Sequence, residues 1–395
     1  MLFDPAAHEP LRNAAWEPAV VERAIRVIAQ DTEDTLRGGD AWWKIHPDDA
    51  EPGDPETFHG IYEGAAGVLW ALRRLAEAGL HDPRHDYALL ANRVWESYLR
   101  RPEFNGPLPS LWMGEGGIAL VVWLAASTPA TTDRLAQIVL TDPADETLEL
   151  MWGSPGFLRI ADVMLQHTGG PRWAAAWKAI ADRLLRRRGE NESGFWTQHL
   201  YGYTSELLGP VHGMAGIIAT LARRPELLPL QRVIAETIDA LSRLAVREGG
   251  QANWPPSLQE GLRHRTGTIR TQWCHGAPGI VTSLASLPPN DDLDALLLAG
   301  GELTWTAGPL CKGANLCHGT AGNGFAFLKL FSRTGNEEWL ARARRFAMHC
   351  IAQLRAIRDR HGHGHYSLWT GDLGTAIYLQ QCLTATSDMP ALDSW

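Results

Sequence analysis

The sequence predicts an all-α fold, an α/α toroid of about seven inner and about seven outer helices that form a single domain over residues 1–395. Three observations lead to this prediction. A Gly-x-x-Gly pair followed by an apolar run recurs along the chain, and amphipathic stretches lie between these runs. No segment shows the sustained alternation of apolar and polar residues that is typical of strands.

The repeated unit begins at a glycine pair. The first glycine of each pair recurs at intervals of about 40–60 residues, at Gly64, Gly114, Gly153, Gly213, Gly276, Gly319 and Gly371. The run that follows, such as residues 117–126, is apolar on nearly every side, and a helix of this kind is buried all round. The runs are therefore expected to be the inner helices, and the glycines allow a sharp backbone turn before each.

The stretches between the glycine pairs are expected to be the outer helices. Residues 336–354 place their apolar side chains on one face, with Asn336 as a helix N-cap and Gly335 ending the element before it. Residues 174–188 show the same pattern and end in an arginine cluster, which suits a helix C-terminus.

The inner helices are too apolar to line an exposed concave face, so the repeats are expected to close into a ring. In a closed ring the glycine turns gather at one end. The Pro-rich segments 46–56 and 253–257 are expected to be loops on that face.

Composition excludes several classes of protein. The chain carries 36 Lys+Arg against 45 Asp+Glu, which gives no electrostatic reason to bind nucleic acid or an anionic membrane surface. No apolar run reaches the length of a membrane span, and the start of the sequence does not resemble a secretion signal. Five cysteines and no such signal favour a cytoplasmic protein with free thiols. The 17 tryptophans are expected mainly in ordinary core packing.

Metal-ligand residue types share one position in three neighbouring repeats. His212, His275 and His318 directly precede the first glycine, and Cys274 and Cys317 stand two residues before it. A helix N-terminus lowers the pKa of a thiol that lies ahead of it, so two thiolates and an imidazole predict a zinc site. Three protein ligands with an open fourth position are favoured over four, which leaves one histidine of His275 and His318 to hydrogen-bond its turn.

Other candidate ligands are set aside. Cys311 lies outside the repeated position, and Cys350 and Cys382 are expected to be buried on helices. The stretch HGHGH at 361–365 is interpreted as a flexible loop rather than a second metal site.

An open zinc site with two thiolate ligands suits a bound thiol substrate and its addition to an activated alkene. His212 is the candidate acid–base group, and Glu149 is the candidate residue to orient it. The structural alternatives are a turn-capping histidine and a surface carboxylate. Two other functional classes are a zinc-stabilised module that binds glutathione or a protein without catalysis, and a glycoside-processing toroid. The latter needs a carboxylate pair, but among the residues that directly precede the first glycines only Glu63 is acidic.

The motifs WCHGAPG at 273–279, LCHGTAG at 316–322 and the seven glycine pairs resemble those of the lanthionine synthetase C-like family, over roughly residues 60–380. The resemblance implies a toroid with a central Zn²⁺ that adds a thiol to dehydroalanine or dehydrobutyrine in a peptide or protein, forming a thioether. It also implies that Cys274, Cys317 and His318 hold the zinc, that His275 does not, and that His212 is the active-site histidine.

Within that family the sequence looks closer to the eukaryotic-type, glutathione-handling branch than to the dedicated lantibiotic cyclases. Lys312 matches a lysine with which that branch holds glutathione, and its alternative is a solvated loop lysine. The start of the chain, LFDPAAHEP, lacks the arginine that helps to bind glutathione in that branch. The resemblance therefore leaves open whether the thiol is glutathione or a peptide cysteine.

Overall fold

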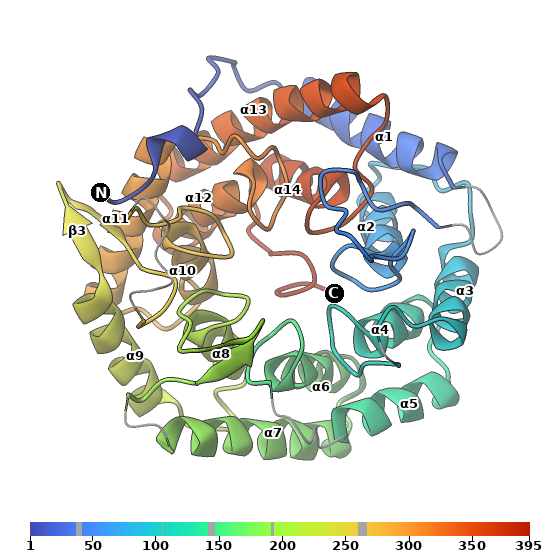
Figure 1. Cartoon of the computed structure of the whole chain (residues 1–395), viewed down its shortest axis with the longest axis horizontal. Helices are drawn as coiled ribbons and strands as arrows, with labels where there is room; N and C mark the ends of the chain where they lie inside the picture. Colours follow the sequence, from blue (N-terminus) through green and yellow to red (C-terminus); the bar gives the residue numbers. More distant parts are fainter. Residues whose placement is uncertain (37–41, 105, 141–146, 191–192, 260–266) are drawn as a thin grey trace.

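The computed structural model describes residues 1–395 apart from 37–41, 105, 141–146, 191–192 and 260–266. The described residues form a closed ring of fourteen α-helices in two concentric layers, as the sequence predicts (Figure 1). The inner helices are α2 (Ala65–Glu77), α4 (Glu115–Ala125), α6 (Ser154–Thr168), α8 (Met214–Leu221), α10 (Ala277–Leu284), α12 (Thr320–Thr334) and α14 (Asp372–Thr384). The outer helices are α1 (Pro18–Asp34), α3 (Tyr87–Arg100), α5 (Pro129–Leu140), α7 (Pro171–Gly189), α9 (Gln231–Leu244), α11 (Asp291–Ala307) and α13 (Glu337–His361).

Every inner helix begins directly after the first glycine of its pair, which occupies the N-cap position. The second glycine packs against the carbonyl oxygen of the residue six positions earlier. A Cβ at Gly279 would lie 2.0 Å from the Trp273 oxygen, and one at Gly322 would lie 1.8 Å from the Leu316 oxygen. Because no side chain fits at this distance, the second glycine is a packing requirement of each turn.

The outer helices have the ends that their sequences predict. Asn336 caps α13 by accepting a hydrogen bond from the Glu338 N–H, and Gly335 ends α12 with φ of 67°. The arginines at the end of α7 lie in its last turn, where they face the negative end of the helix dipole.

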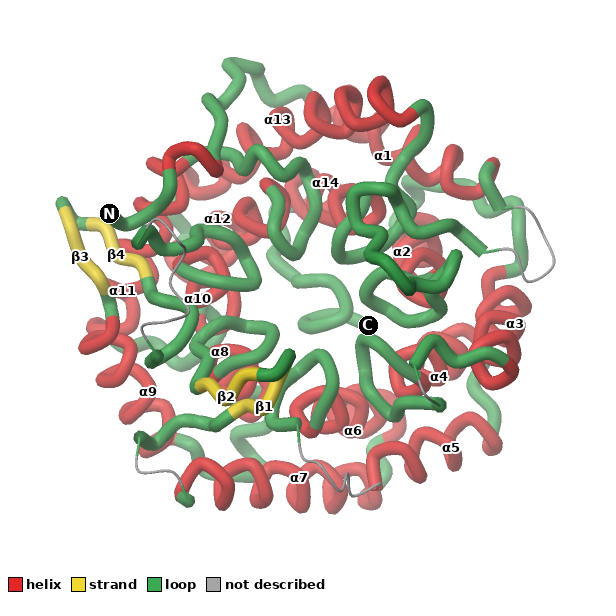
Figure 2. The backbone as a smooth tube through the Cα atoms, viewed as in Figure 1, coloured by secondary structure: helices red, strands yellow, loops and turns green. Residues whose placement is uncertain are grey.

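The remaining regular structure is small (Figure 2). A 3₁₀ helix spans Pro5–Ala7, and two antiparallel hairpins pair β1 (Gln198–Leu200) with β2 (Tyr203–Ser205) and β3 (Val246–Glu248) with β4 (Gln251–Asn253). No helix in the described parts of the chain is long and apolar enough to cross a membrane.

Backbone hydrogen bonds join the turns that precede successive inner helices. The Cys274 N–H donates to Cys317 O, the Cys317 N–H to Trp369 O, the Trp369 N–H to Tyr62 O, and the Tyr62 N–H to Trp112 O, at 3.0–3.1 Å. The link from Trp369 to Tyr62 connects the last repeat to the first and so closes the ring. Because these bonds fix the register between neighbouring turns, they also fix where the two cysteines lie.

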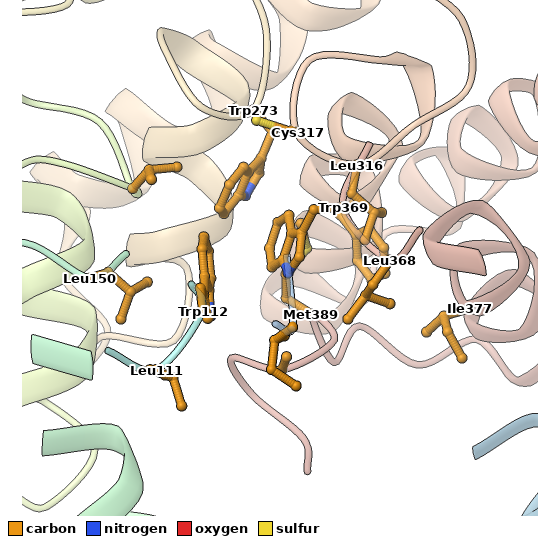
Figure 3. Close-up of a cluster of buried hydrophobic side chains, with 14 of the residues drawn as sticks. Leu111, Trp112, Leu150, Trp273, Leu316, Cys317, Leu368, Trp369, Ile377 and Met389 are labelled. Atoms are coloured by element: carbon orange, nitrogen blue, oxygen red, sulfur yellow. The ribbon is translucent and has the colours of Figure 1, made fainter. Parts of the chain in front are cut away.

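An aromatic cluster fills the centre of the ring. Trp369 lies between Trp112 and Trp273, with ring centroids 4.4 and 4.6 Å away, and all three are fully buried. In Figure 3 this cluster separates Cys317 from Met389, which belongs to the C-terminal tail. The tail runs into the centre of the ring (Figure 1), where Met389 and Ala391 are buried. One end of the ring is thus filled by the tail, and the cysteines lie on the other side of the tryptophans.

Candidate active site

The turns ahead of α10 and α12 carry the two cysteines. Gly276, between Cys274 and α10, has φ of 97°, a left-handed conformation that favours glycine. Asn253 supports this turn, because its Oδ1 accepts a hydrogen bond from the Ala277 N–H at 2.7 Å. With the backbone bond from Cys274 to Cys317, this arrangement brings both thiols to one place.

The contact between the two thiols shifts their pKa values in opposite directions. The hydrogen bond from Cys317, together with one from Gln272 Nε2 at 2.9 Å, lowers the pKa of Cys274 to about 7 against the effect of burial. The same contact raises the pKa of Cys317 well above its ordinary value. The sequence predicts that the helix N-terminus lowers the thiol pKa values, and in the structure the pKa is lowered for Cys274 only, with the neighbouring thiol as the main cause. A cation that binds both sulfurs would displace the thiol protons.

His318 supplies the third predicted ligand. Burial, followed by the positive charge of Lys312, lowers the pKa of His318 to about 4, so its imidazole is neutral as a metal ligand requires. Its ring is not in ligand geometry, however. Among the described residues, the ligand atoms of Cys274, Cys317 and His318 do not all lie within 4.8 Å of one another. The donor types fit zinc, and the His318 ring has to turn toward the thiols for all three to hold one ion.

His275 differs from His318. Its backbone N–H and oxygen form paired hydrogen bonds with Gln272 at 3.0 Å, so the turn is satisfied by main-chain atoms. Its Nδ1 is buried without a hydrogen-bond partner, and burial lowers the pKa of His275 to about 3.

His212 and Glu149 form a hydrogen-bonded pair beside the thiols. Nδ1 of His212 lies 2.7 Å from Oε2 of Glu149, whose side chain is fully buried. The carboxylate also accepts hydrogen bonds from the backbone N–H groups of Met151 and Trp152, at 3.0 and 2.5 Å. The surface-carboxylate alternative for Glu149 is therefore excluded. The charge of His212 reaches Cys274, where it helps to lower the thiol pKa.

Tyr201 is a site residue that the sequence does not predict. It occupies the turn of the β1–β2 hairpin with φ of 54°, and its ring packs edge-on against His212 with centroids 5.7 Å apart. Its hydroxyl accepts a hydrogen bond from Trp152 Nε1 at 3.3 Å. A positive φ at a residue other than glycine often marks a functional position, and this feature of Tyr201 is visible only in the structure.

A cleft of about 400 Å³ opens beside His318. It is lined by Lys312 and His318 on one side and by Asp49, His365 and Thr370 on another. Lys312 is exposed, and its positive charge lowers the pKa values of both Cys274 and His318. The cleft thus places a cation in the same cavity as His318, the proposed third ligand.

The stretch at 361–365 is only partly as predicted. His361 is the last residue of α13, and a loop begins at Gly362. This loop is packed rather than free, because His365 is buried and its Nε2 lies 2.7 Å from Oδ2 of Asp49.

A closed double ring of helices with a thiol pair and a histidine–carboxylate pair at one mouth defines a distinct class of α/α toroid. The family model described as lanthionine synthetase C-like protein matches residues 54–393, and the chain therefore belongs to this family.

Comparisons with individual proteins agree with this membership. The chain is 29% identical over 188 residues to the glutathione S-transferase LANCL1 of Danio rerio, a match that covers 46% of this chain and 44% of the relative. It is 30% identical over 175 residues to the LanC-like protein GCL1 of Arabidopsis thaliana, covering 42% and 38%. Each match thus spans less than half of the relative. The fold is similar to that of nisin cyclase, with a TM-score of 0.60 at 15% identity over 95% of this chain and 99% of that one.

Proposed function

We propose that this protein is a zinc-dependent enzyme that adds a thiol to dehydroalanine or dehydrobutyrine in a peptide or protein. The observation that carries the proposal is the contact between the thiols of Cys274 and Cys317 next to the His212–Glu149 pair. The proposed zinc ligands are Cys274, Cys317 and His318. A zinc ion held there supplies the positive charge that keeps a substrate thiol deprotonated.

The chain's own residues account for the proton transfer. As the substrate sulfur bonds to the β-carbon, the electron pair of the C=C bond moves toward the carbonyl as an enolate, and the α-carbon then takes up a proton. His212 has Nδ1 engaged with Glu149, so Nε2 is the nitrogen that can deliver this proton. One proton leaves sulfur and one reaches carbon, so the net reaction adds S–H across the double bond.

We further propose glutathione as the thiol. The 400 Å³ cleft has room for a small peptide, and Lys312 can pair with one of the carboxylates of the tripeptide. The resemblance of this chain to a relative named as a glutathione S-transferase supports the same choice. The five cysteines are unpaired in the structure, and we place the protein in the cytoplasm, where free thiols persist.

The test uses zinc-loaded, tag-free protein with glutathione and a dehydroalanine peptide, and follows adduct mass over time. We expect formation of the adduct well above the uncatalysed rate. A second peptide, in which a cysteine accompanies the dehydroalanine, separates glutathione addition from ring closure, because ring closure consumes the peptide thiol without a change in mass. No acceleration with either peptide would refute the proposal.

A matched pair of variants separates catalysis from binding alone. His212→Asn removes the proposed proton donor, whereas His199→Asn changes an exposed histidine on the neighbouring β1 strand. We expect the first variant to lose activity while retaining glutathione affinity, and the second to retain both. Glutathione binding without any activity in the unmodified protein would instead support a non-catalytic binding module.

A further inference from the structure

A second group of metal-ligand side chains lies away from the thiols. His46 and Asp48 belong to the loop that follows α1, and His361 ends α13. One ligand atom from each of the three residues lies within 4.8 Å of the others. This is the one such group of His, Cys, Asp and Glu within the described part of the chain.

The distances in this group match those between ligands of one ion. Oδ2 of Asp48 lies 3.3 Å from Nε2 of His361 and 3.6 Å from Nδ1 of His46. In a tetrahedral zinc site with bonds of about 2.0–2.1 Å, neighbouring ligand atoms are about 3.3 Å apart. The imidazole rings of His46 and His361 meet edge to face with centroids 4.5 Å apart, so both approach the same carboxylate.

Hydrogen bonding accounts for the two imidazoles only in part. Nδ1 of His46 accepts a hydrogen bond from the Asp48 N–H at 3.2 Å. The Nε2 atoms of His46 and His361 are both buried and have no hydrogen-bond partner, although that of His361 is close to Asp48. The whole side chain of His46 is 99% buried. A buried polar atom without a partner is destabilising, and a metal ion provides such a partner.

We infer that His46, Asp48 and His361 form a second binding site for a divalent transition-metal ion, most suitably zinc. Two imidazoles and one carboxylate are ligand types that zinc accepts, and the exposed side of Asp48 leaves the fourth position to water. The site goes beyond the proposed reaction, because none of its residues belongs to the thiol or His212 groups.

The position of the site indicates what the ion would do. It would join the loop after α1 to the C-terminal end of α13, and these two helices lie side by side in the outer layer (Figure 1). Asp48 itself lines the cleft that also contains Lys312 and His318, and so does the next residue, Asp49, which contacts His365. On its other side, His46 lines a separate cavity of about 710 Å³. A bound ion would therefore fix one wall of the substrate cleft.

The test measures metal stoichiometry. Full-length, tag-free protein is stripped with a chelator and titrated with Zn²⁺, and the bound zinc is counted by native mass spectrometry. We expect two zinc ions per chain. Asp48→Ala and His361→Gln should each reduce the count to one, whereas Asp54→Ala, an exposed carboxylate of the same loop, should leave two. Loss of a group that only hydrogen-bonds to a metal ligand costs about 10–100-fold in metal affinity. Loss of a ligand itself should therefore cost at least about 100-fold.

Titration with Co²⁺ distinguishes the two sites. Cobalt at Cys274 and Cys317 gives thiolate charge-transfer bands, and cobalt at the histidine site gives none. In Cys274→Ser we expect these bands to disappear while one metal per chain remains. Circular dichroism checks that each variant is folded, and Asp48 is exposed, so its replacement should not disturb folding. A single zinc in the unmodified protein that survives Asp48→Ala and His361→Gln, or a second zinc that survives both, would overturn the inference.

Discussion

Oε2 of Glu149 lies 2.7 Å from Nδ1 of His212, and two backbone N–H groups donate hydrogen bonds to the same carboxylate and hold it in place. This contact fixes the orientation of the imidazole and leaves its Nε2 facing away from Glu149. In the proposed reaction the buried carboxylate is therefore a positioning residue, and the imidazole is the group that would meet the substrate.

Glu149→Gln is expected to lower kcat with little change in KM. The Glu149 carboxylate accepts three hydrogen bonds, from His212 Nδ1 and from two backbone N–H groups. In glutamine an NH₂ group replaces one of the two oxygens, so one of these donors loses its acceptor and the His212 ring is held less firmly. General acid–base catalysis contributes about 10²–10⁴-fold, and we expect a loss of up to about 10²-fold.

A double variant tests whether Glu149 acts through His212. Glu149→Gln combined with His212→Ala should be no slower than His212→Ala alone, because residues that act as one unit are not additive. Steady-state kinetics with the dehydroalanine peptide give the comparison. A double variant that is clearly slower would show an independent role for Glu149.

Replacing either thiol of the pair is expected to abolish zinc binding at the thiol site. Cys274→Ser and Cys317→Ser each leave one sulfur ligand, and activity should fall with the metal. Cys311→Ser is the matched control, since this exposed cysteine lies outside the pair and its thiol pKa is raised rather than lowered. Cobalt charge-transfer absorption measures occupancy. Unchanged absorption in both pair variants would contradict the ligand assignment.

The sequence predicts the architecture well because each helix boundary has a local cause. The glycine pairs mark every inner helix, since their second member packs directly on a carbonyl oxygen six residues earlier. The N-cap at Asn336 is also predictable from the sequence, because the hydrogen bond that it accepts from the Glu338 N–H is a local contact. The placement of Cys274 and Cys317 also follows from the repeat, because successive turns are hydrogen-bonded in register.

The remaining site features depend on contacts between distant segments. His46 meets His361 only because α1 and α13 are adjacent in the closed ring, and Tyr201 reaches His212 only through a hairpin turn with an unusual φ. The opposite pKa shifts of the two thiols likewise depend on their three-dimensional contact. A linear pattern contains none of these relationships.

Lys312→Ala is expected to raise KM for glutathione and leave kcat nearly unchanged. Lys312 is exposed, and exposed ion pairs contribute about 0.2–1 kcal/mol, which corresponds to an increase of at most about 5-fold. The effect should shrink as salt concentration rises, because screening weakens exposed pairs. Lys178→Ala, an exposed lysine on α7, is the control. An unchanged KM at low salt would remove Lys312 from the binding site.

Asp372→Asn is expected to stabilise the protein near neutral pH. Burial raises the pKa of Asp372 from 3.8 to about 6, so the folded state holds a proton that the unfolded state has lost. Stability therefore falls as pH rises from about 4 to about 6, by up to about 3 kcal/mol. Asparagine keeps an acceptor for the His365 N–H and has no charge to bury.

Denaturant midpoints of zinc-saturated protein at about pH 4 and about pH 7 test this prediction. The variant should have a higher free energy of unfolding than the unmodified protein at the higher pH, and the two values should be similar at the lower pH. Asp359→Asn, an exposed residue of α13, should show no such difference. A variant that is destabilised at the higher pH would show that the carboxylate is stabilising there.

Asp393→Asn is expected to destabilise the C-terminal tail that fills the centre of the ring. Asp393 accepts a hydrogen bond from Nζ of the buried Lys329 at 2.8 Å and from the Met389 N–H at 2.9 Å. Although burial acts in the opposite direction, Lys329 and these hydrogen bonds hold the pKa of Asp393 below its ordinary value. The stability that the Asp393 carboxylate contributes to the fold is therefore fully present above about pH 4, and it is lost as pH falls through the lowered pKa. Leaving the Lys329 charge buried without its partner should cost about 3 kcal/mol.

Replacing both partners separates the charge from the shape of the tail. Buried ion pairs can be exchanged for apolar side chains at little cost, so Lys329→Met added to Asp393→Asn should recover most of the lost stability. Denaturant midpoints at neutral pH give the three free energies of unfolding, and the acid-dependent loss assigned to Asp393 should be absent from both variants. If the double variant is as unstable as Asp393→Asn alone, the ion pair has no special part in holding the tail. The tail would then be held by its other contacts, such as the hydrogen bond from Arg159 to the Leu392 oxygen.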